Sequence, residues 1–189
     1  VGVLVALAGV LGLLSLPFGG AAPAGTAWEW DLPKGFPPPA VAPDTPVTVE
    51  RVNLGRHLFY EPLLSGNGKT SCGSCHMQSK AFTDGRARAV GTTGQLHPRS
   101  ALAVINVVYN RTFAWANPAL TTLEKQMLVP LFGTDPVEMG VTDRNRARVL
   151  ARIGANERYR GLFAEAFPGQ DVPVSWQNVV LAIAAFERT

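Results

Sequence analysis

Residues 71–76 read Ser71-Cys72-Gly73-Ser74-Cys75-His76 and contain both cysteines of the chain. Two cysteines three positions apart lie on one helical turn, so that each can form a thioether with a vinyl group of haem. The histidine that follows directly is then held under the ring, where its imidazole can bind the iron. C-x-x-C-H is the attachment motif of c-type haem. The sequence therefore predicts haem c tethered by Cys72 and Cys75, with His76 as the iron ligand.

Three other uses of the two cysteines fit these residues less well. A redox-active C-x-x-C of the thioredoxin type needs a strand before it and a long helix after it. Here SGNGKTS precedes the motif and MQSKAFTDG follows it. A zinc site would need a fourth ligand, for which His57 and His97 are the available histidines. A structural disulfide across three residues is disfavoured.

The composition excludes several broad classes of protein. Of 189 residues, 47% are hydrophobic and 16% charged, which excludes a disordered chain. The net charge of +3 comes without any run of Lys or Arg, so we expect no nucleic-acid partner. Two cysteines are too few for a disulfide-stapled miniprotein.

The first charged residue is Glu29, and the chain opens with the apolar run VGVLVALAGVLGLLSL. That run has the length of a signal-peptide h-region and is short for a membrane span. Small residues around Ala22-Pro23-Ala24 and Gly25-Thr26-Ala27 offer cleavage sites. We interpret residues 1–27 as a signal peptide whose basic n-region is missing, which predicts a periplasmic protein with no stable membrane span after cleavage. An uncleaved N-terminal anchor is the alternative.

Residues 28–46 are rich in proline, which fixes φ and removes backbone donors, so they predict an extended strap. Trp28, Trp30 and Phe36 suggest that the strap lies along a surface. Beyond it the periodic patterns are helical, and the fold class is predicted as all-α with long loops. We expect helices from Thr45-Pro46 to about Phe59, after Ser100 in ALAVINVVYN, after Thr121 or Thr122 in TLEKQMLV (ended by Pro130), after Thr142 in DRNRARVLARIG, in NERYRGLFAEAF, and after Ser175 in WQNVVLAIAAFERT.

Several stretches together resemble the bacterial di-haem cytochrome c peroxidase and MauG family. They are LGRHLFYEPLLSGNGKTSCGSCHMQSKAFTDGRARAVGTTGQ from Leu54, and the later TLEKQMLVPL, DPVEMG and VVLAIAAFERT. Within the family, WDLPKGFPPPAVAPDTP together with HPRSA and WANP is most similar to MbnH-like di-haem enzymes. The resemblance implies a cytochrome c-like, peroxidatic haem domain over residues 47–175. It also implies that residues 176–189 are a helix leading to a second haem domain, absent from this chain.

The resemblance further implies roles for individual residues. Gln126, Pro130 and Glu138 match a distal pocket that reacts with hydrogen peroxide, although two extra residues separate the Gln from the Glu. Glu138 is the candidate that moves a proton between the peroxide oxygens when the O–O bond is cleaved. Trp115 matches a tryptophan that lies between the two haems and relays electrons.

The implied function is a periplasmic di-haem peroxidase that oxidises a small redox protein, a cytochrome c or cupredoxin, or a tryptophan on a partner protein. The family also binds calcium partly through the Asn of an R-N-S segment, where this chain has Arg99-Ser100. The alternative is an electron-transfer cytochrome without peroxidase activity, in which Met127 or Met139 is the sixth iron ligand. His97 could also swing over the iron. Met77 is too close to His76 to reach the other face of the haem. A thiol oxidoreductase without haem is a third hypothesis for the function.

Overall fold

The computed structural model describes residues 25–115 and 117–189; residues 1–24, which hold most of the predicted signal peptide, lie outside this range. The α-helices are α1 (Val49–Phe59), α2 (Cys72–Cys75), α3 (Leu123–Phe132), α4 (Arg146–Gly154), α5 (Glu157–Ala166) and α6 (Trp176–Glu187). Short 3-10 segments are η1 (Pro62–Leu64), η2 (Gln78–Lys80) and η3 (Val107–Tyr109). Within the described residues there is no strand, and pairing is limited to isolated bridges. The predicted all-α class is confirmed.

Side-chain caps decide where four of these helices begin. The side chains of Thr48, Thr122, Asn156 and Ser175 each accept a hydrogen bond from a backbone N–H of the first turn. The start predicted at Thr45-Pro46 was wrong by a few residues. The Trp28 N–H donates to the carbonyl of Val47 at 3.1 Å, which holds the residues before Thr48 in an extended conformation. Similarly, α4 begins at Arg146, because residues 142–145 form a turn in front of it.

Two further helix predictions were wrong. The stretch after Ser100 forms only the short η3, and Asn106 has a left-handed φ of 51°. The apolar residues of this stretch do not form a helix face. Leu102, Val104 and Val107 instead line a cavity from a mainly irregular segment. Several β-branched side chains also lower its helix propensity.

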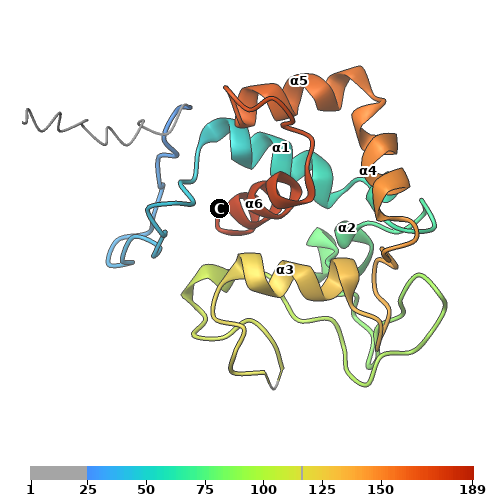
Figure 1. Ribbon diagram of the computed structural model, residues 1–189. Helices are drawn as coiled ribbons and strands as arrows, with labels where there is room; N and C mark the ends of the chain where they lie inside the picture. The colour runs from blue at the N-terminus through green and yellow to red at the C-terminus, as the bar shows by residue number, and fades with distance from the viewer. Residues whose placement is uncertain (1–24, 116) are drawn as a thin grey trace, which may run out of the picture.

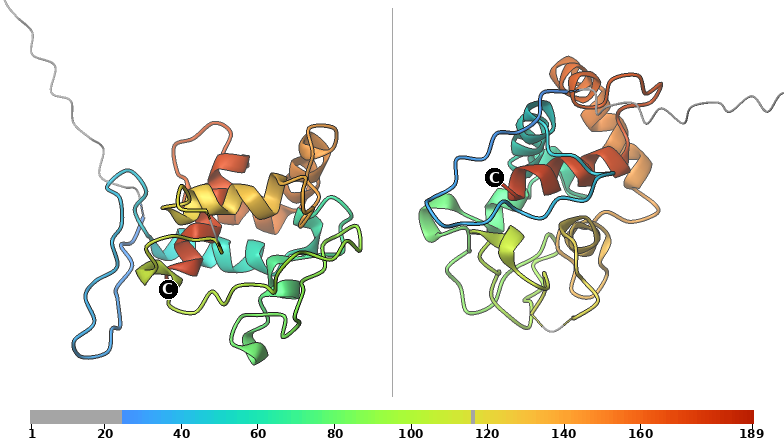
Figure 2. Two further views of the ribbon diagram at one scale, coloured as in Figure 1. Left: turned by 90° about the horizontal axis from the view of Figure 1, so that it is seen from below. Right: turned by 90° about the vertical axis from the view of Figure 1, so that its left-hand side faces the viewer.

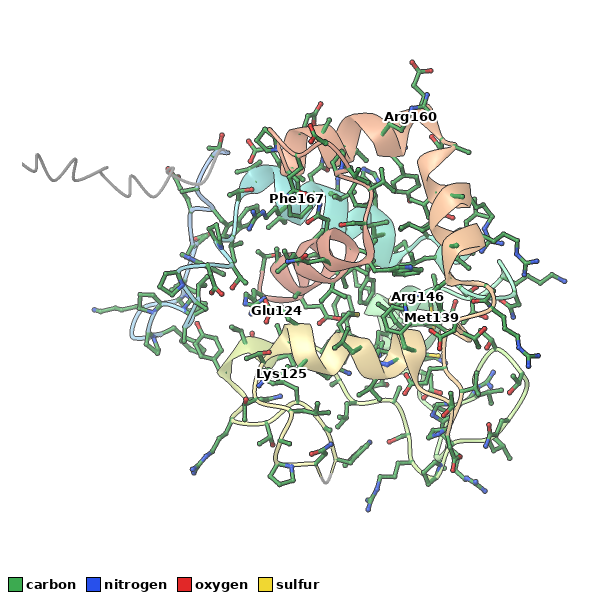
Figure 3. All side chains as sticks on the ribbon, in the orientation of Figure 1. Glu124, Lys125, Met139, Arg146, Arg160 and Phe167 are labelled. Carbon is green, nitrogen blue, oxygen red and sulfur yellow. The ribbon has the colours of Figure 1, made fainter. Side chains whose placement is uncertain are left out.

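Pro130 does not end α3, which continues to Phe132. A proline inside a helix removes one backbone donor and disturbs the turn before it. The returning chain compensates, because Met139 N–H donates to the Pro130 carbonyl at 2.9 Å and Val141 N–H to the Leu131 carbonyl at 3.2 Å. Figure 3 shows Met139 beside that end of α3.

Helices α1 and α6 form the centre of the molecule, with α5 beyond α1 and α3 on the opposite side of α6 (Figure 1). Gly55 permits the close approach of α1 to α6, because a Cβ there would overlap the carbonyl of Ala182 and lie 2.9 Å from the Cβ of Phe186. The main core lies around this contact and includes the fully buried Leu54, Phe59, Phe163 and Ile183.

The strap lies against the end of the molecule where α1 begins and α6 ends, as Figure 2 shows. Trp28 and Trp30 pack on Val47, Val52 and Ala185. The Tyr109 hydroxyl donates to the carbonyl of Pro37 at 2.9 Å, so the strap also contacts η3. In the part of the chain that the structure describes, no helix is long and apolar enough to cross a membrane.

Candidate functional site

A cavity of about 550 Å³ lies between α2, α3 and the long loops that follow α2. Its size falls within the range of about 300–1,000 Å³ that is typical of cofactor and small-ligand sites. Every residue predicted for the site lines this one cavity: Cys72, Cys75, His76, Trp115, Gln126, Pro130 and Glu138. The structure therefore brings together residues that are spread over more than sixty positions of the sequence.

The two cysteines are the first and last residues of α2. Ser71 begins this turn: its N–H donates to the Ser74 hydroxyl at 3.0 Å, and its carbonyl accepts from the Ser74 N–H. The residue between the cysteines must be small, because a Cβ at Gly73 would lie 2.5 Å from Cδ1 of the Tyr60 ring. Tyr60 follows α1, so the end of that helix fixes the position of the cysteine turn.

His76 is oriented by the backbone of the loop that follows it. Its Nδ1 lies 3.0 Å from the carbonyl oxygen of Phe82, to which it can donate. Both Ala81 and Phe82 have a left-handed φ near 55°, a conformation that costs about 1–2 kcal/mol for a residue other than glycine. This strained turn directs the Phe82 carbonyl at the imidazole. A hydrogen bond at Nδ1 leaves Nε2 as the ligand atom, as is usual for histidines that bind metals.

Burial lowers the pKa of His76, although hydrogen bonds to the backbone of Phe82 and Leu102 and the charge of Asp84 act in the opposite direction. The side chain is therefore neutral at pH 7, which is the form that binds iron. An aromatic ring supports it, since the Phe59 and His76 ring centroids are 6.3 Å apart.

The cysteine thiols are free and are not activated as nucleophiles. Burial raises the pKa of both Cys72 and Cys75, and nearby carboxylates add to the effect. The reactive cysteines of thiol oxidoreductases have lowered pKa values instead. Among the residues described here, no group of three or more His, Cys, Asp or Glu side chains could hold a metal ion. Two neutral thiols and one oriented neutral imidazole on a cavity wall are the donor set that haem c requires.

Helix α3 and the loop after it supply a second set of polar groups to the same cavity. Gln126 and Pro130 lie one helical turn apart on α3, and both line the cavity. The Glu138 carbonyl accepts from the N–H of Thr92 at 2.9 Å, which ties its loop to the segment after α2. Burial raises the pKa of the Glu138 carboxyl, and the charge of His97 partly opposes this. The carboxyl is thus held in surroundings that favour its protonated form.

Trp115 lies at the mouth of the cavity, with 52% of its surface exposed. Its Nε1 donates to the carbonyl of Ser100 at 3.1 Å, and the Arg99 guanidinium lies 5.5 Å from the ring centroid. The indole therefore contacts both the cavity and the outer surface. The carbonyl of Arg99 accepts from the N–H of Ala89. Calcium binding near this segment stays a prediction.

The methionines considered as sixth ligands have mixed surroundings. Met127 and Met139 are almost fully buried, and both belong to the main hydrophobic core while also lining the cavity. His57 lies on α1, where its Nε2 is 3.0 Å from a guanidinium nitrogen of Arg158.

Sequence reasoning missed one polar contributor to this cavity, Glu187, and one group outside it, the Phe82 carbonyl. Glu187, near the end of α6, lines the cavity, and burial raises its pKa to about 8. His97, which the sequence suggested could swing over the iron, lines the cavity from the loop side. The Phe82 carbonyl, which orients His76, is invisible in a sequence because any residue carries a carbonyl. A hint for His97 was the short Gly-rich interval between Gly91 and Gly94, which indicates a tight turn.

The family model for di-haem cytochrome c peroxidase matches this chain over residues 49–189. The chain belongs to the di-haem cytochrome c peroxidase family. It is 36% identical over 157 residues to the methylamine utilization protein MauG of Methylorubrum extorquens, covering 83% of this chain and 42% of that protein. It is 33% identical over 144 residues to a cytochrome c551 peroxidase of Pseudomonas aeruginosa, covering 76% of this chain and 40% of that protein.

Among solved structures, a MauG-like protein associated with microbial copper homeostasis matches with a TM-score of 0.84 and 52% identity. The match covers 86% of this chain and 46% of the other. These findings confirm the predicted resemblance to the peroxidase and MauG family, whose cofactor is haem c. The chain spans less than half the length of the curated relatives it matches.

Proposed function

We propose that this chain is the peroxide-reacting haem domain of a periplasmic di-haem oxidoreductase. The observation that carries the proposal is the single cavity that joins the C-x-x-C-H residues to Gln126, Pro130 and Glu138. Cys72 and Cys75 would hold the haem through thioethers, and His76 would be its iron ligand. Bound haem supplies the iron that exchanges electrons with hydrogen peroxide.

The protein's own contribution is to hold peroxide and move a proton. Burial raises the pKa of the Glu138 carboxyl, and this group can donate a proton to the leaving oxygen of hydrogen peroxide, so that this oxygen departs as water. The carboxylate that remains can take the proton of the other peroxide oxygen, which restores the carboxyl for the next turnover. The Gln126 amide can donate to and accept from peroxide and so orient it. The Pro130 ring adds an apolar surface to the cavity wall one turn further along α3.

We infer that oxidising equivalents leave through Trp115, because this indole lines the cavity and is also half exposed. The di-haem family implies a second haem, which would exchange electrons with the first through this indole. The substrate would be a small cytochrome c or cupredoxin, or a tryptophan on a partner protein. The similarity to a MauG-like protein associated with microbial copper homeostasis favours oxidation of a tryptophan on a partner protein. The apolar N-terminal run supports a periplasmic location, because c-type haem is attached on the outer side of the cytoplasmic membrane.

The competing function is electron transfer without peroxidase activity. Its support is that Met127 and Met139 both line the cavity, where either could bind iron. The two functions differ in one measurable property, since a Met-ligated haem is low-spin and does not react with peroxide.

The test is Glu138→Gln in the full-length, haem-loaded protein, with Glu165→Gln, an exposed glutamate of α5, as the matched control. We expect the rate constant for the reaction with peroxide to fall about 10²- to 10⁴-fold in Glu138→Gln, with unchanged haem content. The control should keep the wild-type rate. Equal rates for the two variants would remove Glu138 from the proposal.

A further inference from the structure

His97 is a buried polar side chain whose ring lacks one partner. It is 8% exposed, and its Nε2 has no hydrogen-bond partner among the described residues. A buried polar atom left without a partner costs about 1–3 kcal/mol, so such atoms are rare unless they serve a site. His97 lines the same cavity as Glu138. The orphaned nitrogen therefore points to a role in that cavity.

A short ladder of backbone hydrogen bonds fixes where His97 lies. The His97 N–H donates to the Ala89 carbonyl at 2.8 Å, and the Ala89 N–H donates to the Arg99 carbonyl at 3.0 Å. The Arg88 Nε donates to the His97 carbonyl at 2.6 Å. His97 is thus held on a tight hairpin whose turn contains Gly94, and its position does not depend on its own side-chain contacts.

The same hairpin is attached to the segment that carries Glu138. Thr92 donates its N–H to the Glu138 carbonyl, and a Cβ at Gly91 would overlap the carbonyl of Val137. That Cβ would also lie 3.1 Å from the His97 Nε2. Gly91 therefore lies between the imidazole and the residue before Glu138, and its lack of a side chain lets the two approach.

We propose that His97 is a positioning residue for Glu138: its Nε2 holds the Glu138 carboxyl in place through one water and stabilises the carboxylate left after proton transfer. This inference rests on the proposed function, because it concerns the acid that donates to peroxide. His97 acts through Glu138 and leaves the contact with peroxide to Glu138 and Gln126. A water between the two groups would satisfy the orphaned nitrogen.

The charges around Glu138 support this pairing. Burial raises the pKa of Glu138, and the charge of His97 is the one that lowers it. The two thiols that line the cavity are neutral. The remaining charged groups of the cavity are Glu187 at the end of α6 and Arg99 over Trp115, while Arg88 bonds the outer side of His97.

The experiment compares His97→Gln with His57→Gln in the full-length, haem-loaded protein. His57 offers the same substitution on the surface, where its partner is Arg158. The rate constant for the reaction with peroxide is measured against pH; it falls as Glu138 ionises. Because the loss of His97 raises the pKa of Glu138, we expect this fall to move to higher pH by about 0.5–1 unit in His97→Gln. It should stay at the wild-type pH in His57→Gln. Coincident profiles for all three proteins would overturn the proposal.

A second measurement needs no peroxide and keeps His97 in place. It is a crystal structure of the full-length, haem-loaded wild type. We expect one ordered water within hydrogen-bond distance of both the His97 Nε2 and the Glu138 carboxyl. A His97 Nε2 that shares no water with Glu138 overturns the pairing. A wild type that does not react with peroxide refutes the proposed function, and this structure still decides the pairing.

Discussion

The packing of α1 against α6 predicts opposite effects for the same substitution at two helical glycines. Gly55 lies in α1, where an added Cβ would lie 2.6 Å from the Ala182 carbonyl carbon and 2.9 Å from the Phe186 Cβ. Carbon atoms in contact are normally about 3.5–4.0 Å apart, so the two helices would have to separate by roughly 1 Å. Gly161 lies in α5, is exposed, and has open space where its Cβ would be.

The magnitudes follow from two opposing effects. Alanine favours a helix over glycine by about 1 kcal/mol at either position. Overpacking a core costs about 1–3 kcal/mol and sometimes more, and at Gly55 the obstacle is backbone, which yields little. We therefore expect Gly55→Ala to lower the stability by about 2 kcal/mol and Gly161→Ala to raise it by about 0.5–1 kcal/mol.

The assay is thermal unfolding of the full-length, haem-loaded protein, followed by far-ultraviolet circular dichroism. At about 2–4 °C per kcal/mol for a domain of this size, Gly55→Ala should lower the midpoint by roughly 4–8 °C. Gly161→Ala should raise it by roughly 1–4 °C. A midpoint for Gly55→Ala at or above that of the wild type would refute the helix contact on which the position of Tyr60, and so of the cysteine turn, depends.

Three further predictions concern the cavity. Replacing both Cys72 and Cys75 with serine should lower the haem content by one haem per chain, as measured by pyridine haemochrome; an unchanged content would contradict the attachment site. Burial raises the pKa of Glu187 from 4.5 to about 8, so its neutral form contributes stability that is fully present below about pH 4.5 and is lost as the pH rises through about 8. In the wild type this loss of stability amounts to several kcal/mol, at about 1.4 kcal/mol per pKa unit. Glu187→Gln should make the stability depend less on pH over this range. Glu165→Gln should leave the melting midpoint at each pH as in the wild type. Trp115→Phe should slow oxidation of the partner protein and leave the peroxide reaction unchanged in stopped-flow measurements; equal rates of partner oxidation would exclude the relay.

Local signals in the sequence predicted most helices well. Ser175 and the apolar stripe after it define α6, because a cap and a 3.6-residue period act within one segment. The stretch after Ser100 was wrongly predicted to be a helix for the same reason, because the prediction used its local apolar pattern alone. Its apolar residues line a cavity whose other walls come from distant segments, and no local pattern separates this from a helix face.

The candidate site was predictable as a set of residues but not as an arrangement. The C-x-x-C-H motif is local, whereas Gln126, Pro130 and Glu138 were assigned through family resemblance. The structure adds the backbone groups that hold them: the Phe82 carbonyl at His76 and the Thr92 N–H at Glu138. Backbone hydrogen bonds carry no residue identity, so they could only be found once the chain was folded.

The most direct test of the peroxidase proposal is the optical spectrum of the full-length ferric protein before and after addition of hydrogen peroxide. The proposal predicts a high-spin component that changes on addition of peroxide in the wild type. It predicts a much slower change in Glu138→Gln at equal haem content. A purely low-spin, six-coordinate spectrum that does not respond to peroxide would contradict the peroxidase function and favour a Met-ligated electron carrier.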